Sequence, residues 1–373
     1  MDGIDAVLCD FSCTPPIVNA ARTLPFDKDL RARLDRVRQD PDRYPTSDLA
    51  QLDAALGDAF GAAALAVVEA AGLDPAEVRG IGSHGQTIVH RPESSPPFTL
   101  QIADPHRIAE ATGILTIADF RRADLAAGGQ GAPLAPLIHQ ALLSSAEENR
   151  AVVNLGGIAN ITVLPARGGV SGFDTGPANC FLDLWYRRHH ADRFDAAGAW
   201  AASGRPDPVW LDTLLDDGYL HRPPPKSTGI EYFNPAWLEQ RLPDWSAQRP
   251  ADIQSTLLEF SALSVARAVR SLPAESAPAR LIACGGGAHN PLLLQRVAEG
   301  LDGVPVVSSA EFGLDPDHVE AVLFAWLGRE RLAGRPLSTA RITGARHPIL
   351  AGSVFEPGPG KRNGCASILS ERA

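Results

Sequence analysis

The 373-residue chain has little lysine. Of its 34 basic residues only three are lysine, namely Lys28, Lys226 and Lys361. A Walker phosphate loop needs a lysine between a glycine and a serine or threonine. Lys226 follows Pro225 and Lys361 precedes Arg362, so neither lysine fits such a loop. Genomic codon usage is the favoured explanation for the shortage, and a phosphate site in this chain would have to use other groups.

Other chemistry is missing as well. The five cysteines are an odd number without a CxxC pair, which excludes a disulfide framework and a zinc ribbon and favours a reducing cytoplasm. The serine-hydrolase motif GxSxG and the protein-kinase catalytic loop are absent. These absences leave a phosphotransferase that holds phosphate on glycine turns as the leading class.

The chain is acidic, with a formal net charge of -10 and a pI of about 5.5. This balance argues against nucleic acid or an anionic membrane as partner and favours small molecules. The most apolar stretch, residues 54–73, is interrupted by Asp58 and Glu69. We therefore expect an alanine-rich helix of a folded protein there and no membrane span.

The length predicts two domains of roughly 150 to 200 residues each. Hydrophobic residues make up 45% and charged residues 21% of the chain, which suits a globular protein with a large core. Short β-rich runs alternate with helical segments, a pattern that predicts an α/β fold with a first boundary near residue 140. We expect strands at residues 78–83, 87–90, 98–102, 114–118, 170–173, 280–284 and 304–308, and helices at 136–143, 256–271, 291–300 and 317–333.

Glycine turns follow several of these strands. Gly156 and Gly157 join two β-rich runs, and Gly285, Gly286 and Gly287 stand between a strand and a helix. Backbone N–H groups in such turns can bind phosphate. The opening MDGIDAVLCDF and the later NLGGIANITVL both have a strand, a small-residue turn and a second strand, so a duplication would place two turns across a cleft as a polyphosphate clamp.

Asp174 stands at the predicted end of a strand, directly before Thr175, Gly176 and Pro177. A carboxylate in that place suits a general base, because the strand fixes its direction and the loop leaves it accessible. An Asx-type turn cap is an equal alternative. Asn179 could cap the helix that follows.

Two further segments carry polar groups that could bind a substrate. GSHGQTIVHRP places His84 and Gln86 in a turn, with His90 further along, and hydrogen bonding to a substrate is favoured there over a metal site. ADFRRADLAAGGQGAPLAP carries Arg121 at a strand end, where it suits a carboxylate or phosphate of a ligand. A solvated charge cluster remains the alternative for that segment.

Several blocks together resemble the anhydro-N-acetylmuramic acid kinase family. They run in order through nearly the whole chain and are specific in combination. The family belongs to the superfamily of sugar kinases, actin and heat-shock chaperones. The blocks are GSHGQTIVHRP, TLQIADPHRIAEATG, TIADFRRADLAAGGQGAPLAP, NLGGIANITVLP, GFDTGPANCFLDLW, CGGGAHNPLL and DPDHVEAVLFAWL.

The resemblance implies two ribonuclease H-like domains around a cleft. The first would comprise residues 1–140, with 341–373 returning to it, and the second residues 141–340 with a sugar-binding insertion. It also implies a cytoplasmic, homodimeric enzyme of cell-wall recycling that uses ATP, Mg²⁺ and water. Such an enzyme opens 1,6-anhydro-N-acetylmuramic acid and phosphorylates its 6-oxygen, giving N-acetylmuramic acid 6-phosphate.

By the same resemblance, each candidate residue has an implied role. Asp174 would activate water for attack on the anomeric carbon, as in an inverting glycosidase, while the bridge oxygen takes the γ-phosphoryl group in line. No residue is implied as a metal ligand, since Mg²⁺ would ride on ATP. Residues implied at the sugar are His84, Gln86, Arg121, Asn179 and Glu320. Residues implied at ATP are Met1, Asp2, Gly3, Asp5, Asn154, Gly156, Gly157, Gly285, Gly286, Gly287 and Asn290.

The chain departs from the family at its start. The family opens with a strand and a turn of the form MSGTSxDGxD, and this chain begins inside that turn with Met1-Asp2-Gly3-Ile4-Asp5. We expect a native start upstream of Met1 that supplies an interior strand of the first sheet. Two alternatives stay open: a nucleotide- or sugar-binding pseudoenzyme without the first phosphate turn, and a kinase for another sugar.

Overall fold

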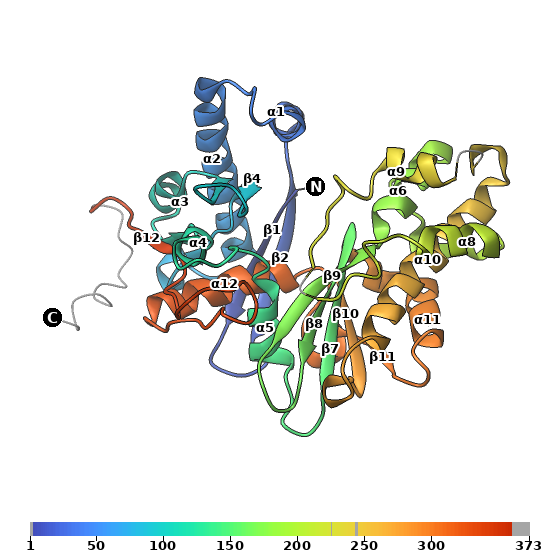
Figure 1. Cartoon of the computed structure of the whole chain (residues 1–373). Coiled ribbons are helices and arrows are strands. Elements are labelled where there is room, and N and C mark those ends of the chain that lie inside the picture. Colours follow the sequence, from blue (N-terminus) through green and yellow to red (C-terminus); the bar gives the residue numbers. More distant parts are fainter. Residues whose placement is uncertain (1–2, 225, 243–244, 360–373) are drawn as a thin grey trace. The chain divides into compact units, whose positions relative to one another are not determined.

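The computed structural model describes residues 3–224, 226–242 and 245–359 (Figure 1). The chain divides into two compact units, one of Met1–Leu137 with Glu320–Ala373 and the other of Ile138–Val319. Helices and mixed sheets occur in both units, which confirms the predicted α/β class. The final part of the predicted returning segment, residues 360–373, lies outside the described residues.

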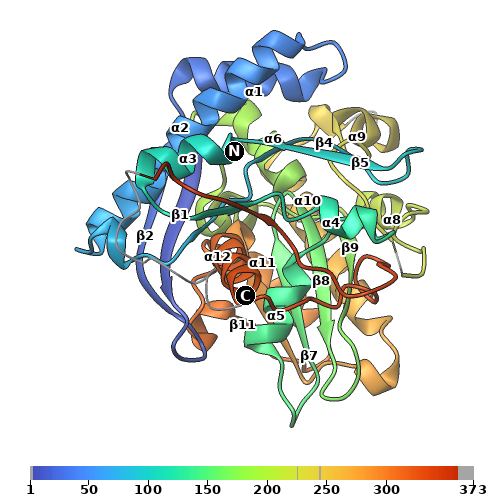
Figure 2. The ribbon, with the colours of Figure 1, turned by 90° about the vertical axis from the view of Figure 1, so that its left-hand side faces the viewer.

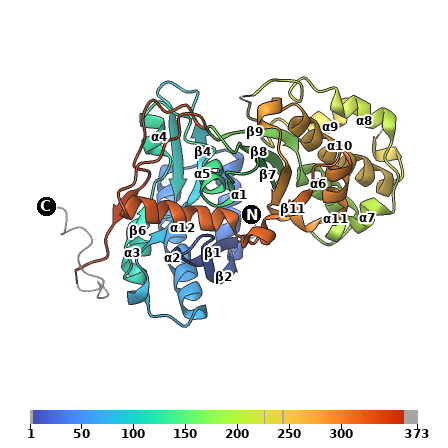
Figure 3. The same ribbon diagram turned by 90° about the horizontal axis from the view of Figure 1, so that it is seen from below.

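The second boundary differs from the predicted one at residue 340. Helix α12 (Val319–Leu332) belongs to the first unit from Glu320 onward (Figure 3). The ring of Phe324 stacks on that of His84 with centroids 4.3 Å apart, and a Cβ on Gly82 would collide with the Phe324 carbonyl oxygen. This close packing makes α12 part of the first unit.

The second unit is built on one five-stranded sheet in the order β11-β10-β7-β8-β9. Strands β7, β8 and β9 are antiparallel, whereas β10 and β11 run parallel to β7. This is the order of a ribonuclease H-like sheet, as the resemblance implies. The strands are β7 (Arg150–Leu155), β8 (Ile158–Leu164), β9 (Ser171–Pro177), β10 (Arg280–Cys284) and β11 (Val306–Ser308).

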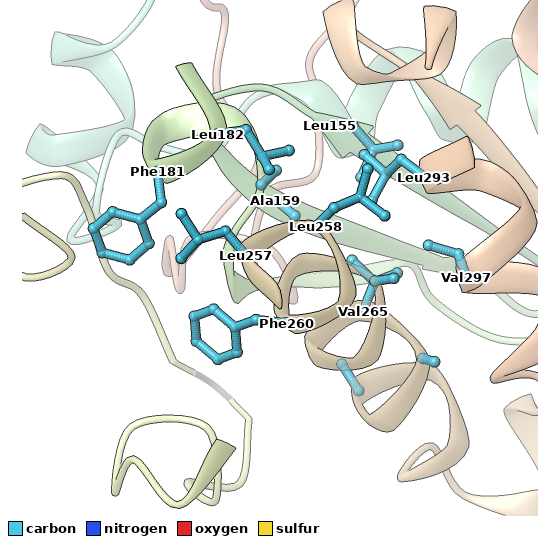
Figure 4. Packing of buried hydrophobic residues seen from close by; sticks show 14 of the residues in the cluster. Leu155, Ala159, Phe181, Leu182, Leu257, Leu258, Phe260, Val265, Leu293 and Val297 are labelled. Carbon is cyan, nitrogen blue, oxygen red and sulfur yellow. The ribbon is translucent and has the colours of Figure 1, made fainter. Parts of the chain in front are cut away.

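Helix α10 (Pro250–Arg270) forms the centre of the core beside this sheet. It begins earlier than predicted because Pro250 suits the first position of a helix. Its residues are buried nearly all round, which is typical of a core helix. Figure 4 shows α10 contributing Leu257, Leu258, Phe260 and Val265 to a cluster with Leu155, Ala159, Phe181, Leu182, Leu293 and Val297.

Other helices of the second unit surround α10. Helices α6, α7, α8 and α11 all contact it. Their bounds and those of α9 are α6 (Asn179–His189), α7 (Ala199–Ala202), α8 (Pro208–Leu215), α9 (Pro235–Arg241) and α11 (Pro291–Glu299).

In the first unit the described strands form three separate sheets, so the strands expected between residues 78 and 118 do not share a single sheet. Strand β6 lies between β12 and β3. Strand β1 pairs with β2, and β4 forms a hairpin with β5 (Figure 2). No pairing among the described residues joins these groups. The strands are β1 (Gly3–Asp10), β2 (Ile17–Pro25), β3 (Ile81–Gly82), β4 (Gln86–Arg91), β5 (Phe98–Ile102), β6 (Thr116–Ala118) and β12 (Ser353–Phe355).

Within the described residues, one helix, α2 (Thr46–Ala70), is long and apolar enough by composition to cross a membrane. Its Leu52 and Leu56 are fully buried, and it packs against β1, β2 and α3. A core helix passes the same test of length and composition, and α2 has the contacts of one. The remaining helices are α1 (Lys28–Gln39), α3 (Pro105–Thr112), α4 (Arg122–Ala126) and α5 (Ala135–Leu143).

His139 on α5 is a buried titratable group of the second unit. Its Nδ1 lies 2.9 Å from the hydroxyl of Thr162 on β8, and burial lowers the pKa of His139 to about 4. In the unfolded chain a histidine has a pKa of about 6.5. At His139 the unfolded state therefore binds more protons between these two values, so the contribution of this residue to the free energy of unfolding falls as the pH falls through this window.

We predict that His139→Gln weakens this acid sensitivity, because glutamine can bond Thr162 but cannot take up the proton. Urea denaturation at pH 7.5 and pH 5 would measure the loss of stability for each variant. His347→Gln, at an exposed histidine, is the matched control. Equal losses for His139→Gln and the unmodified chain would contradict the prediction.

Candidate functional site

Two glycine turns of the second unit lie side by side. Cys284, the last residue of β10, pairs in parallel register with Asn154 near the end of β7. The turns Gly156–Gly157 and Gly285–Gly287 therefore leave the same edge of the sheet, although they are far apart in the sequence. The structure thus brings together the glycines that the sequence assigned to ATP in this unit.

The second turn can be made only by glycine. Gly285 has a φ of 76°, a conformation that side chains rarely adopt. A Cβ on Gly285 would also collide with Oδ1 of Asn154, and a Cβ on Gly287 would lie 2.5 Å from Cβ of Leu155. The second turn therefore packs directly on the end of β7, next to the first turn.

The paired turns suit a polyphosphate. Among the described residues, the amide N–H groups of Gly156, Gly157, Gly286 and Gly287 donate no hydrogen bond to the protein. A Cβ on Gly286 would meet nothing within 4 Å, so the space beside that turn is open. Unpaired amide groups beside open space form an anion site without any lysine.

Two asparagines that were predicted to contact the ligands also make hydrogen bonds within the protein. Oδ1 of Asn290 accepts the N–H of Leu293 at 3.0 Å and caps α11. Nδ2 of Asn179 donates to the carbonyl oxygen of Leu155 at 2.8 Å. The hypothesis that Asn179 caps α6 is wrong, because the cap position is Ala178 and the Asn179 amide is turned toward the glycine turn.

Asp174 was predicted at the end of a strand, but it lies within β9. Asn160 pairs with Asp174 while the neighbouring Ala159 pairs with Gly176, so Thr175 is an extra residue in the ladder. A β-bulge of this kind bends a strand and redirects its side chains. The bulge, and not a strand end, sets the direction of the Asp174 carboxylate.

One oxygen of Asp174 is held by a distant segment. The hydroxyl of Ser227 donates to Oδ2 at 2.9 Å, and the N–H of Thr228 donates to the same oxygen at 3.0 Å. The N–H of Asp174 in turn donates to the carbonyl of Lys226 at 3.2 Å. Among the described residues no donor contacts Oδ1, which stays available to accept a proton. The Asx-turn alternative is wrong, since the donors are not those of a local turn.

The sequence analysis missed Ser227 and Thr228. No short-range pattern could have linked these residues to Asp174, because Ser227 is 53 positions away from it in the sequence.

Burial raises the pKa of Asp174 above its ordinary value. The hydrogen bonds from Thr228 and Ser227 oppose this rise, while the charge of Glu231 adds to it. A carboxylate with a raised pKa is a stronger base, provided that it is still ionised at the working pH. Asp174 has the environment that a general base requires.

In the first unit, His84 and Arg121 are in direct contact. Nη2 and Nε of Arg121 lie 2.9 and 3.2 Å from Nε2 of His84. A guanidinium can only donate, so Nε2 must accept and the ring proton must sit on Nδ1. Burial, and secondly the charge of Arg121, lower the pKa of His84 to about 3. His84 is therefore a neutral hydrogen-bond donor and not an acid–base group.

Arg121 bonds to a loop that is held in place by the buried carboxylate of Asp124. Its Nη1 donates to the carbonyl of Gly131 at 2.9 Å, and the N–H of Gly131 donates to Asp124 at 2.7 Å. Asp124 also accepts the hydroxyls of Thr339 and Thr343 at 2.6 and 2.8 Å. Because the loop is anchored at Asp124, the direction of Arg121 is set by the tertiary structure.

The alternative of a solvated charge cluster is correct for only part of this segment. Asp119 and Arg122 form an ion pair of 2.7 Å whose arginine is largely exposed. Arg121 is directed inward, as the substrate-binding hypothesis requires.

Two other residues predicted at the sugar lie in the first unit with His84 and Arg121. Gln86 is buried at the start of β4 and donates to the carbonyl of Thr87 at 3.1 Å. Glu320 is exposed at the start of α12 and lies within electrostatic range of Arg121 and Asp5. Asp174 and Asn179 belong to the second unit.

The opening segment differs from its prediction. Gly3 and Asp5 were expected in a phosphate turn, but both lie in β1, where Gly3 pairs with Pro25 and Asp5 with Thr23. The hydroxyl of Thr23 donates to Asp5 at 2.6 Å. Met1 and Asp2 lie outside the described residues.

The histidines of the first unit form no metal cluster within the described ranges. Among all described residues, the one group of possible metal ligands lies in the second unit and consists of His289, Asp315 and Asp317, all exposed. It contains neither His84 nor His90.

We predict that His84 stays neutral from pH 5 to pH 8. Its ring ¹⁵N shifts in NMR spectra should remain those of one neutral tautomer with the proton on Nδ1. Arg121→Met should remove the donors to Nε2 and permit the other tautomer, whereas Arg122→Met should leave the spectrum unchanged. Protonation of His84 near pH 6.5 in the unmodified chain would contradict this assignment.

Comparisons with known proteins relate the chain to sugar kinases. The family model described as anhydro-N-acetylmuramic acid kinase matches residues 1–357. A protein of that name from Xylella fastidiosa is 49% identical over 357 residues, covering 95% of this chain and 93% of the relative. One from Xanthomonas axonopodis pv. citri is 49% identical over 360 residues, covering 95% of both.

Solved structures are more distant. Component A of the (R)-2-hydroxyglutaryl-CoA dehydratase of Acidaminococcus fermentans is 13% identical with a TM-score of 0.40, covering 88% of this chain and 99% of that one. The ROK hexokinase of Thermus thermophilus is 15% identical with a TM-score of 0.38, covering 87% and 100%. The match of the family model and the identity to curated relatives together show that this chain belongs to the anhydro-N-acetylmuramic acid kinase family.

Proposed function

We propose that this chain is an ATP-dependent kinase that opens 1,6-anhydro-N-acetylmuramic acid and phosphorylates its 6-oxygen. Its family and the names of its relatives support this function. The observation that carries it is the carboxylate of Asp174, whose Oδ2 is held by two donors while Oδ1 has none among the described residues. That arrangement suits a base that removes a proton from water.

The proposed reaction uses one base for two bond changes. Oδ1 of Asp174 takes a proton from water as the water oxygen bonds to the anomeric carbon. The bond from that carbon to the bridge oxygen breaks, and the freed oxygen bonds to the γ-phosphorus. The bond between the γ-phosphorus and ADP then breaks, leaving N-acetylmuramic acid 6-phosphate.

Other groups would bind and orient the reactants. The amide groups of Gly156, Gly157, Gly286 and Gly287, which have no partner among the described residues, would hold the phosphates of ATP. His84 and Arg121 would donate hydrogen bonds to the sugar, and Arg121 would suit a carboxylate on it. Asn154, Asn179, Asn290, Gln86 and Glu320 stay candidates for contact with the ligands.

We further propose that Mg²⁺ accompanies ATP, because a bound cation neutralises charge on the transferring phosphate. A homodimer that works in the cytoplasm on sugars released from the cell wall is proposed from the family resemblance. Loss of turnover on chelation by EDTA and its return with Mg²⁺ would support the first point. A monomer in analytical ultracentrifugation at micromolar concentration would contradict the proposed homodimer.

We predict that Asp174→Asn lowers turnover by about 100-fold to 10,000-fold, because the amide cannot accept the proton. Binding of ATP should stay within about twofold, since Asp174 is no part of the phosphate turns. The assay follows the phosphorylated sugar by mass spectrometry in ¹⁸O-labelled water, which should place one label on the anomeric carbon. Asp212→Asn, at an exposed residue of α8, is the matched control.

Three results would contradict the proposal. Most of the activity retained in Asp174→Asn would exclude that residue as the base. Binding of sugar and ATP without transfer by the unmodified chain would favour the pseudoenzyme alternative. Transfer to another amino sugar but not to the anhydro sugar would favour the alternative of a kinase for another sugar.

A further inference from the structure

The segment that holds Asp174 is itself firmly anchored. Nζ of Lys226 donates to the carbonyls of Leu220 and Tyr219 at 3.0 and 3.3 Å and lies 4.9 Å from the Tyr219 ring centroid. The hydroxyl of Tyr219 donates to the carbonyl of Asp174 at 2.8 Å. Lys226 thus ties the segment to the residue that also fixes the backbone of Asp174.

A second anchor is the buried carboxylate of Asp217. It accepts the N–H of Tyr219 at 2.8 Å, the hydroxyl of Tyr232 at 3.1 Å and the indole N–H of Trp237 at 3.1 Å. Arg241 pairs with the same carboxylate. These donors come from both sides of the segment, so Asp217 restrains the loop at its two ends.

From these contacts we propose that Ser227 is a positioning residue that determines which oxygen of Asp174 acts as the base. The Ser227 hydroxyl and the Thr228 amide both occupy Oδ2, so Oδ1 is the oxygen presented to water. This inference rests on the proposed function, in which Asp174 is the base.

Ser227 is the informative position to change. Thr228 contributes a backbone N–H, which no side-chain substitution removes, whereas Ser227 contributes a side-chain hydroxyl. Ser227 is also exposed, so its truncation leaves no buried polar group behind apart from one lone pair on Oδ2. The anchors at Lys226 and Asp217 stay in place, and the loop should keep its fold.

The test compares Ser227→Ala with the conservative Ser227→Thr. We expect Ser227→Ala to lower kcat by about 10-fold to 100-fold, the effect of losing one hydrogen bond to a charged group. The KM values for ATP and sugar should change by less than about twofold, because Ser227 is proposed to contact neither. Ser227→Thr keeps a hydroxyl and should restore most of kcat.

The pH dependence distinguishes orientation from a structural effect. Ser227 stabilises the anion of Asp174, so its removal should raise the pKa of that carboxyl further and move the acid limb of the kcat profile to higher pH. Titration of ¹³C-labelled aspartate by NMR, with the signal assigned through Asp174→Asn, measures the same shift without any turnover.

The matched control is Ser203→Ala, since Ser203 is an exposed serine of the same unit whose hydroxyl donates to the carbonyl of Trp200. It should leave kcat, the pH profile and the NMR titration unchanged. An unaltered kcat and an unaltered Asp174 titration in Ser227→Ala would overturn the inference. A shifted titration in a chain without kinase activity would show that Ser227 stabilises the Asp174 anion but would reject the proposed function, and with it the role of Asp174 as the base.

Discussion

The pairing of β7 with β8 on one side and β10 on the other is the constraint on which the second unit depends. It places the turn after β7 beside the turn after β10, and it fixes β9, which carries Asp174, at the far side of β8. The buried helix α10 supports this arrangement with apolar contacts to the strands and to α11. A shift of one residue in the register of β10 would move Gly285 away from Asn154 and separate the two glycine turns.

Burial has opposite effects on the two titratable groups of greatest interest. It raises the pKa of Asp174 and lowers that of His84, because in each case the charged form loses solvation. The first effect would strengthen Asp174 in its proposed role as a base, and the second keeps an imidazole neutral beside a guanidinium. Each group also has a partner that fixes which of its atoms is free, Oδ1 in Asp174 and Nδ1 in His84.

The scarcity of lysine has a structural counterpart. The two glycine turns present backbone N–H groups, and the proposed phosphate site needs no lysine, in agreement with the absence of a Walker loop. Lys226, one of only three lysines, instead ties the segment that holds Asp174 to two carbonyl groups. Three flexible donors on a long stem suit that task, because they can reach two acceptors on neighbouring residues.

The family and the elements of local structure follow from the amino-acid sequence, because motifs, apolar periodicity and glycine turns are short-range patterns. Strands β5 and β10 were predicted with their observed bounds, and the glycines that follow β7 and β10 were recognised as turns. The assignment of α12 to the first unit, the bulge at Thr175 and the inward direction of Arg121 were decided by tertiary contacts. The hydrogen bond from Ser227 to Asp174 was also decided by tertiary contacts, because these residues are 53 positions apart in the sequence and only the packing of the folded unit brings them together.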